Sequence, residues 1–214
     1  IPGYSDYLHP YDENHIIGIG KDVDESIDAD KIHDPNAVYY TAIQGVKLAL
    51  FDVSDVANPI EVSKYVIGDR GTDSIALQDH KAFLFDKNKN LLVLPILLAE
   101  QKNKTSDYYG DYTFQGAYVF DVTLDNGFVL RGRITHQPDN DTLLKSGYYF
   151  DSEFSVKRSL YIGDVLYTIS DALIKMNDLA TLAPINAVTL PIAKEPVYYP
   201  GPVPLPMTVG IAVK

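Results

Sequence analysis

The sequence predicts an all-β chain, and three observations support this fold class. Apolar runs of 5 to 8 residues, rich in Val, Ile, Tyr and Phe, recur along the chain. The 14 Gly and 13 Pro are scattered between these runs, where they favour turns. Long amphipathic helical patterns are absent from the sequence. The candidate strands are His15–Ile19, Val46–Val53, Ile60–Ile67, Lys81–Phe85, Leu91–Leu98, Ala117–Val122, Phe128–Ile134, Val165–Ser170 and Ile185–Leu190.

Internal repeats group these strands into three similar units. Gly45–Val53 and Gly116–Val122 both end in Phe-Asp-Val, and each is followed by a polar turn and another strand. Ala172–Met176, followed by Asn-Asp, is a weaker third copy. An apolar strand precedes each copy, and the first strand of each unit is expected near Tyr4–Leu8, Ser74–Phe85 and Arg158–Ile162. A four-stranded antiparallel meander repeated in tandem is typical of β-propeller blades, which we expect at about residues 1–70, 71–137 and 150–190.

Two insertions lengthen the first two blades. Lys21–Tyr40 and Glu100–Thr113 both fall between the second and third strands of their units. Equivalent positions in neighbouring blades lie on the same face of a propeller, so both insertions should emerge together. Loops that share one face of a repeat protein are common binding sites.

Several longer motifs resemble a known family. They are Leu8–Lys21, Leu50–Pro59, Asp79–Asp86, Phe114–Val119 and Gly132–His136. In these runs the chain resembles an archaeal and bacterial family of secreted proteins with a C-terminal β-propeller distantly related to WD40 repeats. The resemblance covers about residues 1–190 and implies an extracytoplasmic propeller. It implies no catalytic residues.

Three blades are fewer than the roughly four to eight of a closed propeller. The chain is therefore expected to be part of a longer protein, or to be completed by other copies of itself. Residues 191–206 are rich in Pro and predict an extended linker. Residues 207–214 have strand character, and we expect either a strand that adds to a sheet edge or a loose tail.

Charge and composition exclude several function classes. The 18 Lys and Arg against 29 Asp and Glu give a formal net charge of −11, which argues against nucleic acid or an anionic membrane surface as the main partner. The absence of Cys excludes disulfides and thiolate metal sites. Apolar runs long enough to span a membrane are also absent.

The first insertion carries closely spaced carboxylates. Asp22, Asp24, Asp28 and Asp30 could together wrap a hard cation, because Ca²⁺ prefers carboxylate and carbonyl oxygens. The segment lacks the glycine and the terminal glutamate of an EF-hand. The alternative is a solvated acidic loop without a metal.

Tyrosines cluster in or beside the expected loops. Tyr39, Tyr40, Tyr108, Tyr109 and Tyr112 are the candidate binding residues, since tyrosine suits both sugar rings and protein partners. An interface between repeats would need similar residues. Two glycosylation sequons, at Asn103 and Asn140, fall in expected surface loops.

These patterns lead to one functional prediction and one alternative. We expect a noncatalytic extracytoplasmic module that binds another protein, other copies of itself or a surface glycan, with Ca²⁺ as its only expected cofactor. The alternative is a propeller hydrolase that acts on a polysaccharide or peptide through a channel-facing carboxylate pair.

Overall fold

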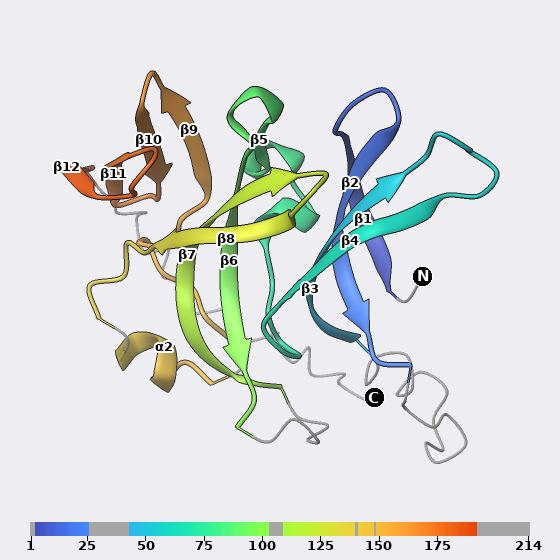
Figure 1. Ribbon diagram of the computed structural model, residues 1–214. Helices are drawn as coiled ribbons and strands as arrows, with labels where there is room; N and C mark the ends of the chain where they lie inside the picture. The colour runs from blue at the N-terminus through green and yellow to red at the C-terminus, as the bar shows by residue number, and fades with distance from the viewer. Residues whose placement is uncertain (1–2, 26–42, 103–108, 140, 148, 192–214) are drawn as a thin grey trace, which may run out of the picture.

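The chain forms three four-stranded antiparallel sheets, which stand side by side in the computed structural model (Figure 1). The structure describes residues 3–25, 43–102, 109–139, 141–147 and 149–191. In each sheet the strands follow one another in chain order, so each is a simple meander. The predicted fold class, all-β with three propeller blades, is confirmed. The expected linker at 191–206 and strand at 207–214 lie outside the described residues, apart from Pro191.

We name the sheets blades A, B and C. Blade A consists of β1 (Tyr4–Pro10), β2 (His15–Val23), β3 (Ile43–Asp52) and β4 (Ile60–Ile67). Blade B consists of β5 (Leu84–Asp86), β6 (Leu91–Glu100), β7 (Asp111–Thr123) and β8 (Gly127–Ile134). Blade C consists of β9 (Arg158–Ile162), β10 (Val165–Ile169), β11 (Leu173–Asp178) and β12 (Pro184–Thr189).

The middle strands of blades A and B extend further than their apolar runs predict. The β2–β3 ladder continues to the pair Val23 and Ile43, and the β6–β7 ladder continues to Glu100 and Asp111. Backbone pairing of two neighbouring strands persists after the side chains become polar. The insertions are therefore shorter than their sequence limits suggest.

The first strand of blade B differs from the prediction. Only Leu84–Asp86 is a strand, and most of Ser74–Phe83 forms two 3₁₀ turns instead. Ser74 and Asp79 cap these turns through their side chains, which favours local turns over a sheet ladder. The neighbouring strand β6 carries Pro95, which has no N–H to offer a continuous partner strand.

A short helix was missed by the sequence patterns. Residues Asp141–Lys145 form α2, whose Lys145 ammonium lies 2.8 Å from the carboxylate of Asp141. Five residues are too few to show a helical period. Leu143 buries the apolar side of this helix.

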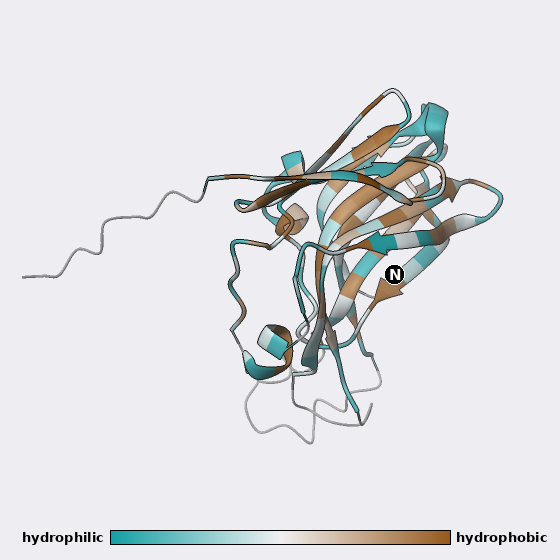
Figure 2. Cartoon of the chain, turned by 90° about the vertical axis from the view of Figure 1, so that its left-hand side faces the viewer, coloured by the Kyte–Doolittle hydropathy of each residue, from teal (hydrophilic) through white to brown (hydrophobic). Residues whose placement is uncertain are grey.

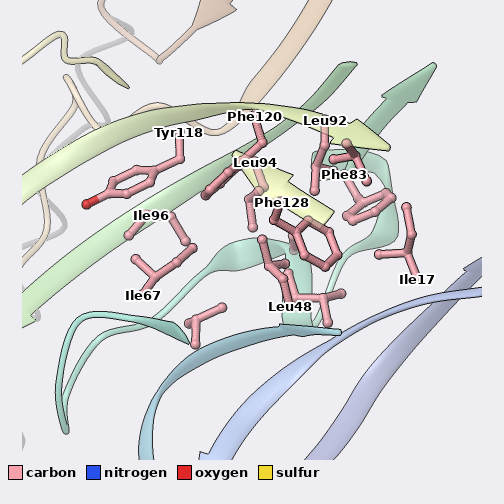
Figure 3. Packing of buried hydrophobic residues seen from close by; sticks show 14 of the residues in the cluster. Ile17, Leu48, Ile67, Phe83, Leu92, Leu94, Ile96, Tyr118, Phe120 and Phe128 are labelled. Atoms are coloured by element: carbon pink, nitrogen blue, oxygen red, sulfur yellow. The ribbon is translucent and has the colours of Figure 1, made fainter. Parts of the chain in front are cut away.

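Most of the apolar core lies between the blades. The larger cluster joins Ile17, Leu48 and Ile67 of blade A to Leu94 and Phe120 of blade B (Figure 3). A second cluster joins blade B to blade C and includes Val119, Ile134, Val156, Leu166 and Leu179. Each blade is therefore stabilised mainly by its neighbours, as in other repeat architectures.

The outward faces of blades A and C are less buried than the faces between blades. Val119 in blade B is fully buried, whereas the equivalent Met176 in blade C is only partly buried. The same contrast holds for Phe120 in blade B and Phe51 in blade A. Figure 2 views the chain from the side of blade C and shows hydrophobic stretches along its strands. The apolar side chains on the outward face of blade C are Leu160, Ile162, Val165, Tyr167, Ile169, Ile174, Met176 and Val188.

Candidate binding site at the insertion end of the blades

The long connections of blades A and B leave their sheets at the same end of the molecule. The ends of β2 and β6 both point to the lower edge of Figure 1, and we call this end the insertion end. The linker between the two blades, residues 68–73, is hydrogen-bonded to blade B. Its Asp69 N–H donates to Ala99 O at 2.9 Å, and its Arg70 O accepts from Gly110 N–H at 2.8 Å. The prediction that both insertions share one face agrees with this arrangement.

Tyr109, one of the expected binding tyrosines, is positioned by the blade linker. The guanidinium carbon of Arg70 lies 4.8 Å from the centroid of the Tyr109 ring, a cation–π contact. Gly71 lies on the same ring, and a Cβ at Gly71 would sit 3.1 Å from the ring carbon Cδ1. Gly71 also has a φ of +103°, which disfavours any other residue. Tyr109 is thus held by its neighbours while 52% of its surface remains exposed.

A pocket of about 340 Å³ opens beside Tyr109, and we call it the insertion-end pocket. Its aromatic lining consists of Tyr4, Tyr109 and Tyr112. Its polar lining includes Lys21 and Asp73, whose ammonium and carboxylate lie 3.1 Å apart. Aromatic faces beside a small number of oriented polar groups are typical of ligand sites.

A second pocket of about 270 Å³ adjoins the first, and we call it the central pocket. Asp73 and Leu97 line both pockets. Phe150 lines the central pocket, and its ring centroid lies 6.5 Å from that of Tyr112 in the insertion-end pocket. The two pockets therefore share part of their lining.

Two of the expected metal ligands line a separate hollow of about 510 Å³ at the same end. Asp22 and Asp24 lie there with Glu25 and Asp69. The Asp22 carboxylate is 3.3 Å from the ammonium of Lys64, a cation that competes with a metal ion. Within the part of the chain that the structure describes, no group of three or more acidic or histidine side chains could hold a metal. The calcium site therefore stays a prediction that depends on Asp28 and Asp30.

Some of the predicted binding, metal-ligating and glycosylated residues lie outside the described residues. The residues that lie outside the described ranges are Tyr39, Tyr40, Tyr108, Asp28, Asp30, Asn103 and Asn140. Of the predicted binding residues, Tyr109 and Tyr112 meet in one pocket.

Asp6 and Tyr112, near the insertion-end pocket, have shifted pKa values. Burial raises the pKa of the Asp6 carboxyl; the positive charge of Lys21 opposes this shift and the negative charge of Asp73 adds to it. Burial also raises the pKa of the Tyr112 hydroxyl, with smaller contributions from Asp73 and Tyr109. Tyr112 is therefore neutral at physiological pH.

Two histidines, His9 and His136, lie between blades and away from the pockets. His9 lies among aromatic rings at the interface of blades A and B, and its ring centroid is 5.2 Å from that of Phe83. His136 is 3% exposed and makes hydrogen bonds of 2.9 and 2.8 Å with the hydroxyls of Ser170 and Thr168. Burial, with the nearby charge of Lys175, lowers the pKa of His136 to about 4. His136 is therefore a neutral group that joins blades B and C.

Sequence patterns did not identify the residues that hold the tyrosines. Arg70, Gly71 and Asp73 lie in the blade linker, and Lys21 lies 52 positions before Asp73. One signal in the sequence pointed to this linker: Gly68 and Gly71, which flank Asp69 and Arg70. Both glycines have a positive φ, a backbone conformation that other residues rarely adopt.

Comparison with known proteins identifies the family. A family model described as a beta propeller domain matches residues 1–182. The chain belongs to the β-propeller family. This β-propeller is 32% identical over 170 residues to an uncharacterized protein of Methanocaldococcus jannaschii, covering 79% of the chain but 18% of that relative. It is 33% identical over 95 residues to an uncharacterized protein of Archaeoglobus fulgidus, covering 44% of the chain and 12% of that relative.

The β-propeller thus spans less than a fifth of the length of the two relatives. Among its described residues, no helix is long and apolar enough to cross a lipid bilayer.

Proposed function

We propose that this β-propeller is a noncatalytic, extracytoplasmic module that binds a protein or a surface glycan at the insertion-end pocket. The observation that carries the proposal is the placement of Tyr109 and Tyr112 in one pocket with Tyr4, at the end where both insertions leave the blades. Tyrosine gives a large contact area at low entropic cost, and it can hydrogen-bond through its hydroxyl. The contacts of Tyr109 with Arg70 and Gly71 hold its ring in place before a ligand binds.

Binding measurements on arrays of neutral oligosaccharides and of peptides test this proposal. We expect the wild-type chain to bind members of one array, and Tyr109→Ala to weaken that binding about tenfold, because truncation of an aromatic anchor costs more than about 1 kcal/mol. Leu124→Ala is the control, since Leu124 is also exposed but lies on the β7–β8 hairpin. Failure to bind either array, or equal binding by Tyr109→Ala, would contradict the proposal.

The extracytoplasmic location is supported by the resemblance to a secreted family and by the two sequons at Asn103 and Asn140. Recovery of the native protein from its source and measurement of its intact mass test the glycosylation. Calorimetric titration of chelator-treated protein with Ca²⁺ tests the acidic loop, and no heat of binding would remove calcium from the proposal.

We also propose that another copy of the chain covers the outward face of blade C. Leu160, Ile162 and Val188 on this face are 40%, 66% and 43% exposed. Met176 shares the face and is equivalent in the repeat to Val119, which a neighbouring blade buries completely. An apolar sheet face of this kind is seldom left in water. The outward face of blade A, which carries Phe51, is the surface of the other copy that would contact blade C. In blade B the equivalent residue, Phe120, packs against the preceding blade.

The hydrolase alternative rests on a pair of carboxylates beside the insertion-end pocket. Burial raises the pKa of Asp6, while Asp73 is paired with the ammonium of Lys21. A carboxyl whose pKa is raised, close to a carboxylate that is paired with an ammonium group, is an arrangement that acid–base hydrolysis can use. Release of reducing sugar from an oligosaccharide by the wild-type chain, and its loss in Asp73→Asn, would favour this alternative over the noncatalytic module.

A further inference from the structure

The insertion-end pocket and the central pocket adjoin and share part of their lining, and we call the two together the groove. Both are lined by Asp73 and Leu97, and the rings of Tyr112 and Phe150 pack together at their junction. Tyr109 lines only the insertion-end pocket, and Gln78 lines only the central pocket. An elongated groove with aromatic rings along it suits a chain-like ligand better than a compact one.

The main chain along this groove is already hydrogen-bonded. Leu97 and Asp73 exchange both of their backbone hydrogen bonds, at 2.8 and 2.9 Å. Pro95 has no N–H, and its carbonyl accepts from the Ser74 hydroxyl at 2.6 Å. On the opposite wall, the side-chain amide of Gln115 occupies both backbone groups of Val156. An extended peptide that adds to a sheet edge needs a row of unpaired backbone groups, and these positions do not supply one.

The ligand must therefore be recognised by side chains. The charged groups that line the groove are of both signs, since Lys21, Arg70 and Lys157 are cationic and Asp73 and Asp151 are anionic. Such a mixed lining favours a neutral ligand that offers many hydroxyl groups over a polyanion or a polycation. Gln78 and Asp151 are exposed in the central pocket, where they can donate to or accept from such hydroxyls.

We propose that this groove binds a linear, neutral oligosaccharide that extends from the tyrosines of the insertion-end pocket to Gln78 and Asp151 in the central pocket. The inference rests on the proposed binding function and names its ligand class. Sugar rings present apolar C–H faces that pack on tyrosine and phenylalanine, and hydroxyl edges that hydrogen-bond to amides and carboxylates. A longer saccharide would contact both pockets, whereas a disaccharide would occupy only one.

The test compares short and long saccharides on the full chain. The probes are neutral oligosaccharides of two and six sugar units from β-1,4-glucan, β-1,3-glucan, mannan and chitin, with binding measured by calorimetry. We expect at least one hexasaccharide to bind about tenfold more tightly than its disaccharide, because it gains the contacts of the second pocket. The double variant Gln78→Ala with Asp151→Ala should remove this gain, so that the hexasaccharide binds no more tightly than the disaccharide. Asp125→Ala, an exposed carboxylate variant on the β7–β8 hairpin, should change neither.

Each result has a defined meaning. A disaccharide that binds in a Tyr109-dependent way, with no gain for the hexasaccharide, overturns the extended groove and leaves the proposed function standing. Equal hexasaccharide affinity in the double variant and the wild type also overturns the extended groove and leaves the proposed function standing. Binding to extended peptides and to none of the saccharides overturns the ligand class. If neither saccharides nor peptides bind, the groove and the proposed function both fail.

Discussion

His136 shows how a single residue can make the contact between two blades depend on pH. His136 follows β8 of blade B in the chain and is buried. Its ring makes hydrogen bonds with two hydroxyls of blade C. Both ring nitrogens have hydroxyl partners, which can satisfy the neutral ring as either donor or acceptor. The nearby ammonium of Lys175, which donates to Thr135 O at 2.7 Å, disfavours a second positive charge.

Protonation of His136 should therefore destabilise the fold at acid pH. Its pKa falls from 6.5 to about 4 on folding, so between these values the unfolded chain binds a proton that the folded chain does not. Its contribution to stability is complete above pH 6.5 and is lost as the pH falls toward 4, by at most about 3 kcal/mol. Urea unfolding of the wild type at pH 7 and pH 4.5 should show a lower midpoint at the acid pH.

Two variants isolate the contribution of His136. His136→Asn should be less stable than the wild type at pH 7 and should lose much of the change in midpoint between the two pH values. His80→Asn, at an exposed histidine, should keep the wild-type change. The carboxylates with lowered pKa values, such as Asp79 and Asp86, lose their contribution only below about pH 3.8. A wild-type midpoint that is equal at pH 7 and pH 4.5 would contradict this account.

At the scale of the element, strands two to four of each blade were predictable, and so were the first strands of blades A and C, whereas the first strand of blade B was not. Phe-Asp-Val and its flanking turns mark β3 and β7 because both copies stand at the end of the third strand of a repeat. The first strand of blade B was not predictable, since its sequence is apolar enough for a strand. The side-chain caps at Ser74 and Asp79 decide the local structure, and Pro95 is 21 residues away from the serine that it contacts.

Ser74 is the residue whose replacement tests this explanation. Its buried hydroxyl donates to Pro95 O at 2.6 Å and accepts from Ala76 N–H at 3.1 Å. Ser74→Ala should destabilise the chain by about 1–3 kcal/mol in urea unfolding, because a buried carbonyl and a buried N–H lose their partner. Ser54→Ala, at an exposed turn, should change stability by less than about 0.5 kcal/mol. Equal stability of Ser74→Ala and the wild type would show that the 3₁₀ turns do not depend on this cap.

At the scale of the whole molecule, the repeats predict the arrangement of blades but not the binding groove. The placement of both insertions at one end follows from blade geometry, and it predicts that Tyr109 and Tyr112 lie at that end. The partners of these tyrosines come from the blade linker and from the 150–157 connection, which carry no repeat pattern. The contacts of Tyr109 with Arg70, and of Tyr112 with Phe150, form only when the blades pack.

Self-association is the prediction that belongs to this scale. The outward face of blade C carries a row of apolar side chains, and Ile174 lies directly opposite Val188 within it. Sedimentation of the wild-type chain at physiological salt, where the repulsion due to its net charge of −11 is screened, should show association between copies. Ile174→Glu with Met176→Glu should give a monomer, because two carboxylates on this face would have to lose their water in the contact. Leu124→Glu, on the β7–β8 hairpin, should associate like the wild type, and a monomeric wild type would refute this role for blade C.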